Sequence, residues 1–208
     1  LMKRGGVGYA QPDAGTFPPL DDVNAAIIAC GAIPVAAWLD GSSEGEQRME
    51  DLLDLHIAKG LGALTIIPER NWHFSDPAVR EVKVRALYEV VEMARARDLP
   101  IVVGTEMNKA GQPLIDDFGS DALGPLVGDM LRGADWIYGH TLLARALGRG
   151  YQSDWAHRYL PGRGERNAFY TAVGAAAEPG AETLARLEGL RAVETPDRLL
   201  GRIEGLGQ

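Results

Sequence analysis

The sequence predicts an α/β fold of repeated parallel βα units, followed by a helical tail. Short apolar runs alternate with longer amphipathic stretches as far as about residue 140. Glycine follows most of the amphipathic stretches, which is typical of the C-terminal ends of helices. After residue 140 the sequence contains helical patterns but no evident strand. Together these observations favour a parallel sheet or barrel with helices packed around it.

Five apolar runs are predicted to be strands because they are short, rich in β-type residues and bounded by turn residues. They cover 6–10, 34–39, 63–67, 100–104 and 135–138. The runs are continuously apolar rather than alternating, as expected for strands buried on both faces of a parallel sheet. The connections between them are long enough to be right-handed crossovers between parallel neighbours.

Four helices are predicted between the strands, each with a capping or terminating residue. They extend from Asp21 to Cys30, from Ser42 or Ser43 to Gly60, from Asp76 to Asp98 and from Ser120 to near Gly133. Asp76 followed by Pro77 is the clearest start signal, because aspartate caps helices and proline is favoured at the first helical position. Five further helices are predicted in the tail, over 141–147, 151–159, 166–176, 181–192 and 196–206.

The 208 residues are predicted to form one domain, with a barrel-like core over 1–140 and a helical extension over 141–208 packed on it. Five βα units are too few for a closed eight-stranded barrel of about 250 residues. We therefore expect a distorted or incomplete TIM-like barrel, with part of the N-terminal half missing from this chain. A five-stranded open doubly wound sheet is the alternative that needs no missing part.

Composition limits the classes of partner. The formal net charge is -8 and no basic stripe is present, which argues against nucleic acid. No stretch approaches the roughly 18 apolar residues that would span a bilayer, so no membrane is expected. Cys30 is the only cysteine, which excludes an internal disulfide and is compatible with the predicted cytoplasmic location. The oligomeric state is not predicted.

Several enzyme classes lose support because their motifs are missing from the sequence. No strand is followed by a phosphate-binding loop of the nucleotide type or by the dinucleotide fingerprint. The nucleophile elbow of serine hydrolases is also missing.

Polar, ionisable residues follow the predicted strands where the apolar runs stop. Those with acidic or imidazole groups are Asp40, Glu69, Glu106 and His140. Because the carboxyl ends of parallel strands lie at one edge of a sheet, we expect these side chains to gather there. The sequence therefore predicts the place of a site, but the fold alone does not identify a substrate.

The segments that contain Glu106 and Arg70 each allow a functional role or a structural role. Glu106 can ligate a metal or act as a general base, or it can cap a helix or pair with Lys109. Arg70 can hold a carboxylate or phosphate through two hydrogen bonds, or it can form a structural ion pair with Glu69.

The other two segments leave similar alternatives open. Gly139 leaves room for the His140 imidazole to approach a ligand or metal, although a lone histidine is also common in cores and at helix ends. Asp40 can contact a metal or substrate, or it can form a turn. His73 follows Trp72 in a predicted loop.

The order of these motifs resembles the carboxyl-terminal part of a PHP-type domain, a distorted barrel among the amidohydrolase-like metal-dependent hydrolases. The resemblance covers about 31–108 and rests on the segments 32–40, 60–67 and 101–108. It implies a divalent metal, Zn, Mn or Mg, with Asp40, Glu106 and His140 as ligands and Glu69 as a further candidate. The chain departs from that family in having no His-x-His pair.

The function favoured by the sequence is a metal-dependent hydrolase that cleaves an ester, phosphoester or amide in a small, polar, anionic substrate. The expected catalytic residues are Glu69, Glu106 and His140. The residues expected to bind the substrate are Arg70, Asn71, Trp72 and Asn108.

Two alternatives of other classes stay open. A sugar isomerase or lyase would use Glu69 and Glu106 to move a proton, with Asn71 and Asn108 orienting hydroxyl groups. A barrel without catalytic activity would bind a carbohydrate or a partner protein through tryptophans. The candidates for that role are Trp72, Trp136 and Trp155.

Overall fold

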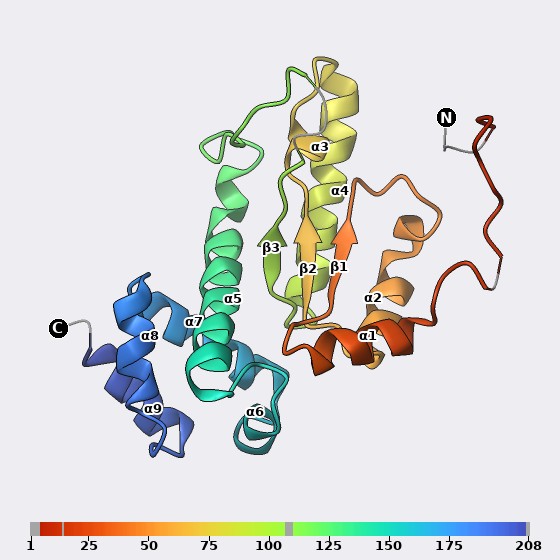
Figure 1. The fold of residues 1–208 in the computed structure, drawn as a ribbon. Coiled ribbons are helices and arrows are strands. Elements are labelled where there is room, and N and C mark those ends of the chain that lie inside the picture. Colours follow the sequence, from red (N-terminus) through yellow and green to blue (C-terminus); the bar gives the residue numbers. More distant parts are fainter. Residues whose placement is uncertain (1–4, 14, 107–109, 207–208) are drawn as a thin grey trace.

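The computed structural model describes residues 5–13, 15–106 and 110–206. Its sheet has three parallel strands in the order β1-β2-β3. They are β1 (Val35–Trp38), β2 (Ala63–Ile66) and β3 (Ile101–Val103). Helices surround the open sheet and follow it to the C-terminal end (Figure 1). The α/β class, the parallel strands and the helical C-terminal region are confirmed, whereas the described residues form a small open sheet and not a barrel.

Two of the five predicted strands are wrong. Residues 6–10 form turns and irregular backbone, and 135–138 lie inside helix α5 (Val127–Leu147). The second error has a physical cause, because a run as short as Trp136-Ile137-Tyr138 does not distinguish a strand from a buried helix. The predicted helix end at Gly133 is wrong for the same reason, since α5 continues through it.

Helices fill both connections between the strands and the region beyond them. Before β3 lie α1 (Leu20–Ala29), α2 (Met49–Ala58), α3 (Glu69–Trp72) and α4 (Pro77–Arg95). After α5 come α6 (Asp154–Tyr159), α7 (Arg163–Ala176), α8 (Ala181–Glu188) and α9 (Pro196–Glu204). Short 3₁₀ turns, Glu46–Arg48 and Gly124–Leu126, lead into α2 and α5. None of the helices in the described ranges combines the length and apolar character needed to cross a membrane.

The capping predictions are confirmed for Asp76 and Gly31, whereas the helix starts predicted at Ser43 and Ser120 are shifted, because α2 begins at Met49 and α5 at Val127. Asp76 Oδ1 accepts a hydrogen bond from the backbone N–H of Ala78 at 2.9 Å, which caps α4. Gly31 follows α1 with a φ of +74°, the left-handed conformation that favours glycine. Ser43 Oγ accepts from the backbone N–H of Glu46 at 3.2 Å, so this serine caps the 3₁₀ turn and not α2.

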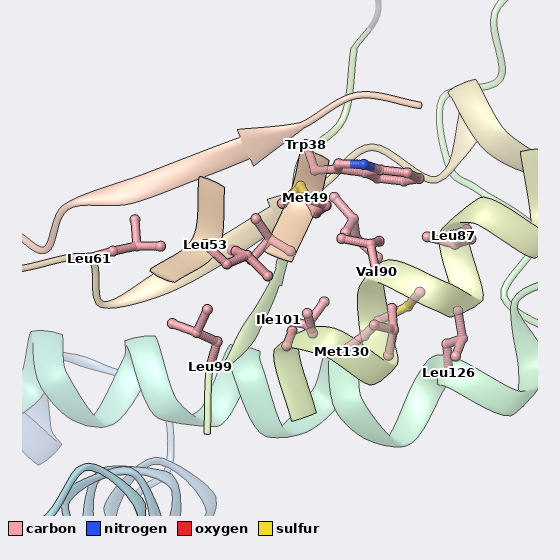
Figure 2. Close-up of a cluster of buried hydrophobic side chains, with 14 of the residues drawn as sticks. Trp38, Met49, Leu53, Leu61, Leu87, Val90, Leu99, Ile101, Leu126 and Met130 are labelled. Carbon is pink, nitrogen blue, oxygen red and sulfur yellow. The ribbon is translucent and has the colours of Figure 1, made fainter. Parts of the chain in front are cut away.

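One hydrophobic cluster, called here the sheet core, lies between the sheet and helices α2 and α4. Leu64 and Ile66 of β2 both join it, because alternate side chains of a strand point to the same face. Figure 2 shows Trp38, Val90 and Ile101 meeting in this cluster from β1, α4 and β3. The sheet core therefore fixes how the first two crossover connections pack on the strands.

A second cluster, called here the C-terminal core, lies between α5 and the helices that follow it. Ala63 from β2 belongs to it, so the C-terminal helices pack against the other face of the sheet. Helix α5 contributes Met130 to the sheet core and Trp136 and Leu143 to the C-terminal core. The predicted boundary at residue 140 falls inside this helix, which joins both cores.

Backbone contacts bring α5 very close to its neighbours. A Cβ atom at Gly133 would lie 1.7 Å from the backbone oxygen of Ile101 in β3. A Cβ atom at Gly174 in α7 would lie 1.9 Å from the backbone oxygen of Asp135 in α5. Both positions therefore need glycine for close packing, which explains why Gly133 lies within a helix instead of ending one.

Candidate functional site

A pocket of about 270 Å³, called here the strand-end pocket, lies at the carboxyl ends of the strands. Its lining residues come from the segments after all three strands. They are Asp40, Glu69, Arg70, His73, Phe74, Glu106 and Gln112. Figure 1 shows α3, which carries Glu69 and Arg70, beyond the tip of β2. The parallel topology thus brings together four of the residues that the sequence places after separate strands.

Arg70 and Glu106 form an ion pair across the pocket. Arg70 Nε donates to Glu106 Oε2 at 2.6 Å, and the two side chains are 36% and 28% exposed. This hydrogen bond raises the pKa of the Arg70 guanidinium above its ordinary value, and the nearby charges of Glu106, Asp40 and Glu69 act in the same direction. Arg70 therefore carries a permanent positive charge beside these carboxylates.

Asp40 is held in a turn and paired with a cation. Its Oδ1 accepts from the backbone N–H of Ser42 at 3.0 Å and lies 3.2 Å from Nζ of Lys83 in α4. Burial alone would raise the pKa of Asp40, but hydrogen bonds from Ser42 and Lys83 outweigh it and the pKa lies below its ordinary value. Asp40 thus forms the turn proposed for it and also presents an ionised carboxylate to the pocket.

Glu69 differs from the other two carboxylates because it forms no ion pair with any described residue. Its Oε2 accepts a hydrogen bond from Gln112 Nε2 at 3.0 Å. The Gln112 amide carries no charge, and although the charge of Arg70 acts on Glu69, the guanidinium is hydrogen-bonded to Glu106 and Lys83 is paired with Asp40. Glu69 is therefore the best placed carboxylate to accept a proton from a bound molecule.

Asn71 and Trp72 were predicted to contact a substrate, but neither lines the pocket. Asn71 is fully buried, and its Nδ2 donates to the backbone oxygens of Leu39 at 2.9 Å and Ile67 at 3.0 Å. Trp72 Nε1 donates to Asp116 Oδ1 at 2.9 Å, and its ring packs against the sheet core. Both predictions are corrected, because the Nδ2 of Asn71 is bonded to two backbone oxygens and the Nε1 of Trp72 is bonded to the Asp116 side chain.

Asn108, the remaining predicted substrate contact, lies outside the described residues.

His140 lies away from the strand-end pocket, so the prediction that it joins Glu69 and Glu106 is wrong. It is 7% exposed within α5, and its Nδ1 accepts from the backbone N–H of Tyr151 at 2.9 Å. The backbone of Gly31, which precedes β1, also interacts with its ring, whereas Asp40 follows β1. His140 thus packs near the amino ends of the strands, because the segment before it is helical and not a strand.

The residues that the PHP resemblance implies as metal ligands do not fit a shared ion. His140 is separated from Asp40 and Glu106, which are paired with Lys83 and Arg70. Within the described ranges, no group of three or more His, Cys, Asp or Glu side chains is arranged to hold a metal.

Four lining or neighbouring residues, among them Phe74, were not assigned to the site from the sequence. His73 lies one helical turn after Glu69, a spacing that would have placed both on one face if α3 had been predicted. Lys83 comes from α4 with its side chain 19% exposed, and Gln112 comes from the loop after β3. No local pattern marks either of them.

Searches for similar proteins found no matching family model, curated protein or solved structure, so the PHP resemblance stays a prediction from motifs.

His140 is buried and His56 is half-buried, which gives the stability of the chain a pH dependence with a defined sign. Burial lowers the pKa of His140, and also those of His56 and His157. In the unfolded chain a histidine has a pKa of about 6.5, so the unfolded state binds more protons below that pH. We therefore expect the urea midpoint of unfolding to fall between pH 7.5 and pH 5.5.

The variant His140→Gln distinguishes the contribution of the histidines from the loss of stability that protonated carboxylates cause at low pH. It should flatten the pH dependence, because one of the buried imidazoles no longer titrates. Carboxylates with lowered pKa values, such as Asp40 and Asp129, lose their contribution only below about pH 4. An unchanged midpoint between pH 7.5 and pH 5.5 would contradict the burial of these histidines.

Proposed function

We propose that the chain is an enzyme that acts on a small polar molecule bound in the strand-end pocket, with Glu69 as the general base. The observation that carries this proposal is that ionisable side chains from the ends of all three strands line one pocket. Sites at the carboxyl ends of parallel strands are where α/β enzymes place their chemistry.

The chemistry of the lining residues supports proton transfer. Glu69 forms no ion pair with the described residues, and its carboxylate can take a proton from a carbon or an oxygen of the bound molecule. Arg70 uses its Nε for Glu106, and its Nη groups make no hydrogen bond to the described residues. These donors can stabilise negative charge that develops on a substrate oxygen. His73 lines the same pocket and is a group that can return the proton.

Among the predicted reaction classes, the isomerase or lyase needs only these acid and base groups. It is therefore the class that the described geometry supports best. Hydrolysis is the second candidate, because Glu69 can equally take a proton from a water molecule in a pocket that also holds His73.

Proton exchange in D₂O tests the proposal and does not require the product to be identified. The protein would be incubated with aldoses, ketoses, uronates, hydroxy acids and amino acids, and the loss of carbon-bound proton signals would be followed by NMR. We expect exchange in at least one compound and a decrease of about 10²-fold or more in Glu69→Gln. The matched control is Glu81→Gln, since Glu81 is exposed on α4 and lies outside the pocket lining.

Two outcomes would redirect the proposal. An exchange rate that Glu69→Gln leaves unchanged would remove Glu69 as the base. Stoichiometric Zn or Mn in the purified protein, lost in Glu106→Gln, would favour the metal-dependent hydrolase instead.

A further inference from the structure

We propose that the strand-end pocket takes a neutral, hydroxyl-rich molecule of monosaccharide size. This inference deepens the proposed function and depends on it, because it names the class of molecule bound at the same site. It also replaces the anionic substrate that the sequence led us to expect.

The charge balance of the pocket disfavours an anion. Asp40 is paired with Lys83 and Glu106 is paired with Arg70, so together with the carboxylate of Glu69 these five side chains carry one net negative charge. Arg70 was the group expected to hold a substrate carboxylate or phosphate, but Glu106 already occupies its Nε. An anionic molecule could reach the Nη donors of Arg70 only beside the carboxylates of Glu69 and Glu106, which would repel it.

The mixture of donors and acceptors matches hydroxyl groups. An anion needs donors and a cation needs acceptors, whereas each hydroxyl group both donates and accepts. The pocket offers carboxylate acceptors on Glu69 and Glu106 and guanidinium donors on Arg70 within one lining. This arrangement can satisfy several neighbouring hydroxyl groups at once.

The size and the single aromatic ring of the pocket agree with this class. The volume of about 270 Å³ is below the range of roughly 300 to 1,000 Å³ typical of drug-sized ligands, so the molecule must be small. Phe74 lines the pocket and is 36% exposed, which leaves part of its ring free to contact the apolar C–H face of a sugar.

Ligand-observed NMR with matched probes tests the inference by binding alone. The probes are neutral monosaccharides (glucose, fructose, xylose and arabinose) and two hexuronates (glucuronate and galacturonate). We expect at least one neutral sugar to bind about tenfold more tightly than either uronate. Glu69→Gln should reduce that ratio by at least about threefold, because it removes one negative charge from the pocket, and Glu81→Gln should not.

A second pair of variants tests the contact with the ring. Phe74→Ala should weaken binding of the neutral sugar about fivefold or more, whereas Phe118→Ala should not, since Phe118 is equally exposed but does not line the pocket. Equal or tighter binding of a uronate would overturn the inference, and so would a lack of binding by every neutral sugar. The proposed function would survive either result if Glu69→Gln still abolished proton exchange in another compound of the D₂O panel.

Discussion

Replacing Gly174 with alanine is expected to lower the free energy of unfolding by about 3 kcal/mol. The new Cβ atom would lie 1.9 Å from the backbone oxygen of Asp135 and 2.6 Å from its carbonyl carbon. Backbone atoms cannot rotate away as a flexible side chain can, so α5 and α7 would have to separate. Urea denaturation monitored by circular dichroism measures this loss as a lower urea midpoint of unfolding, with the slope of the transition unchanged.

Gly201→Ala is the matched control, because Gly201 also lies inside a helix and its added Cβ would meet nothing within 4 Å. Alanine is the better helix former, so this variant should be neutral or more stable by up to about 1 kcal/mol. The two substitutions are chemically identical and should change stability in opposite directions. Wild-type stability in Gly174→Ala would show that α5 and α7 are not packed at this distance.

The second large effect is expected from Trp136→Ala, which should cost about 3 to 5 kcal/mol. The indole is fully buried in the C-terminal core and packs edge to face on Tyr151, with ring centroids 4.9 Å apart. Its removal leaves a cavity between α5 and the helices that follow. Thermal and urea unfolding of the purified variant measure the loss.

Trp136→Phe should lose much less stability than Trp136→Ala. The comparison tests whether the loss in Trp136→Ala comes from packing. The Nε1 of Trp136 is buried and has no hydrogen-bond partner among the described residues. Phenylalanine loses some buried area but also removes an unsatisfied donor, whose burial costs about 1 to 3 kcal/mol. A loss in Trp136→Phe as large as that in Trp136→Ala would contradict this account.

The sequence predicts the sheet and the place of the pocket well because both depend on local patterns. Three apolar runs followed by capped or glycine-ended helices are the three strands of the structure. Polar residues directly after those runs, such as Asp40 and Glu106, line the pocket because parallel strands end at one edge.

The errors arise where tertiary contacts decide the role of a residue. Gly133 matches the pattern of a helix end, but its function is to let α5 approach the backbone of Ile101. Asn71 matches the pattern of a substrate contact, but its amide joins the backbone after β1 to the backbone after β2. His140 follows an apolar run that is one side of a helix buried by several neighbours. No spacing within the sequence distinguishes these alternatives.

Helix α5 has 21 residues and supplies side chains to both cores, so neither core can lose its packing without affecting the other. Damage to the C-terminal helices would therefore reduce the fraction of molecules with an intact pocket, although no residue of the pocket had changed. Mutations far from the strand ends can therefore lower the total activity of the protein by reducing the amount of folded protein, without changing the pocket itself.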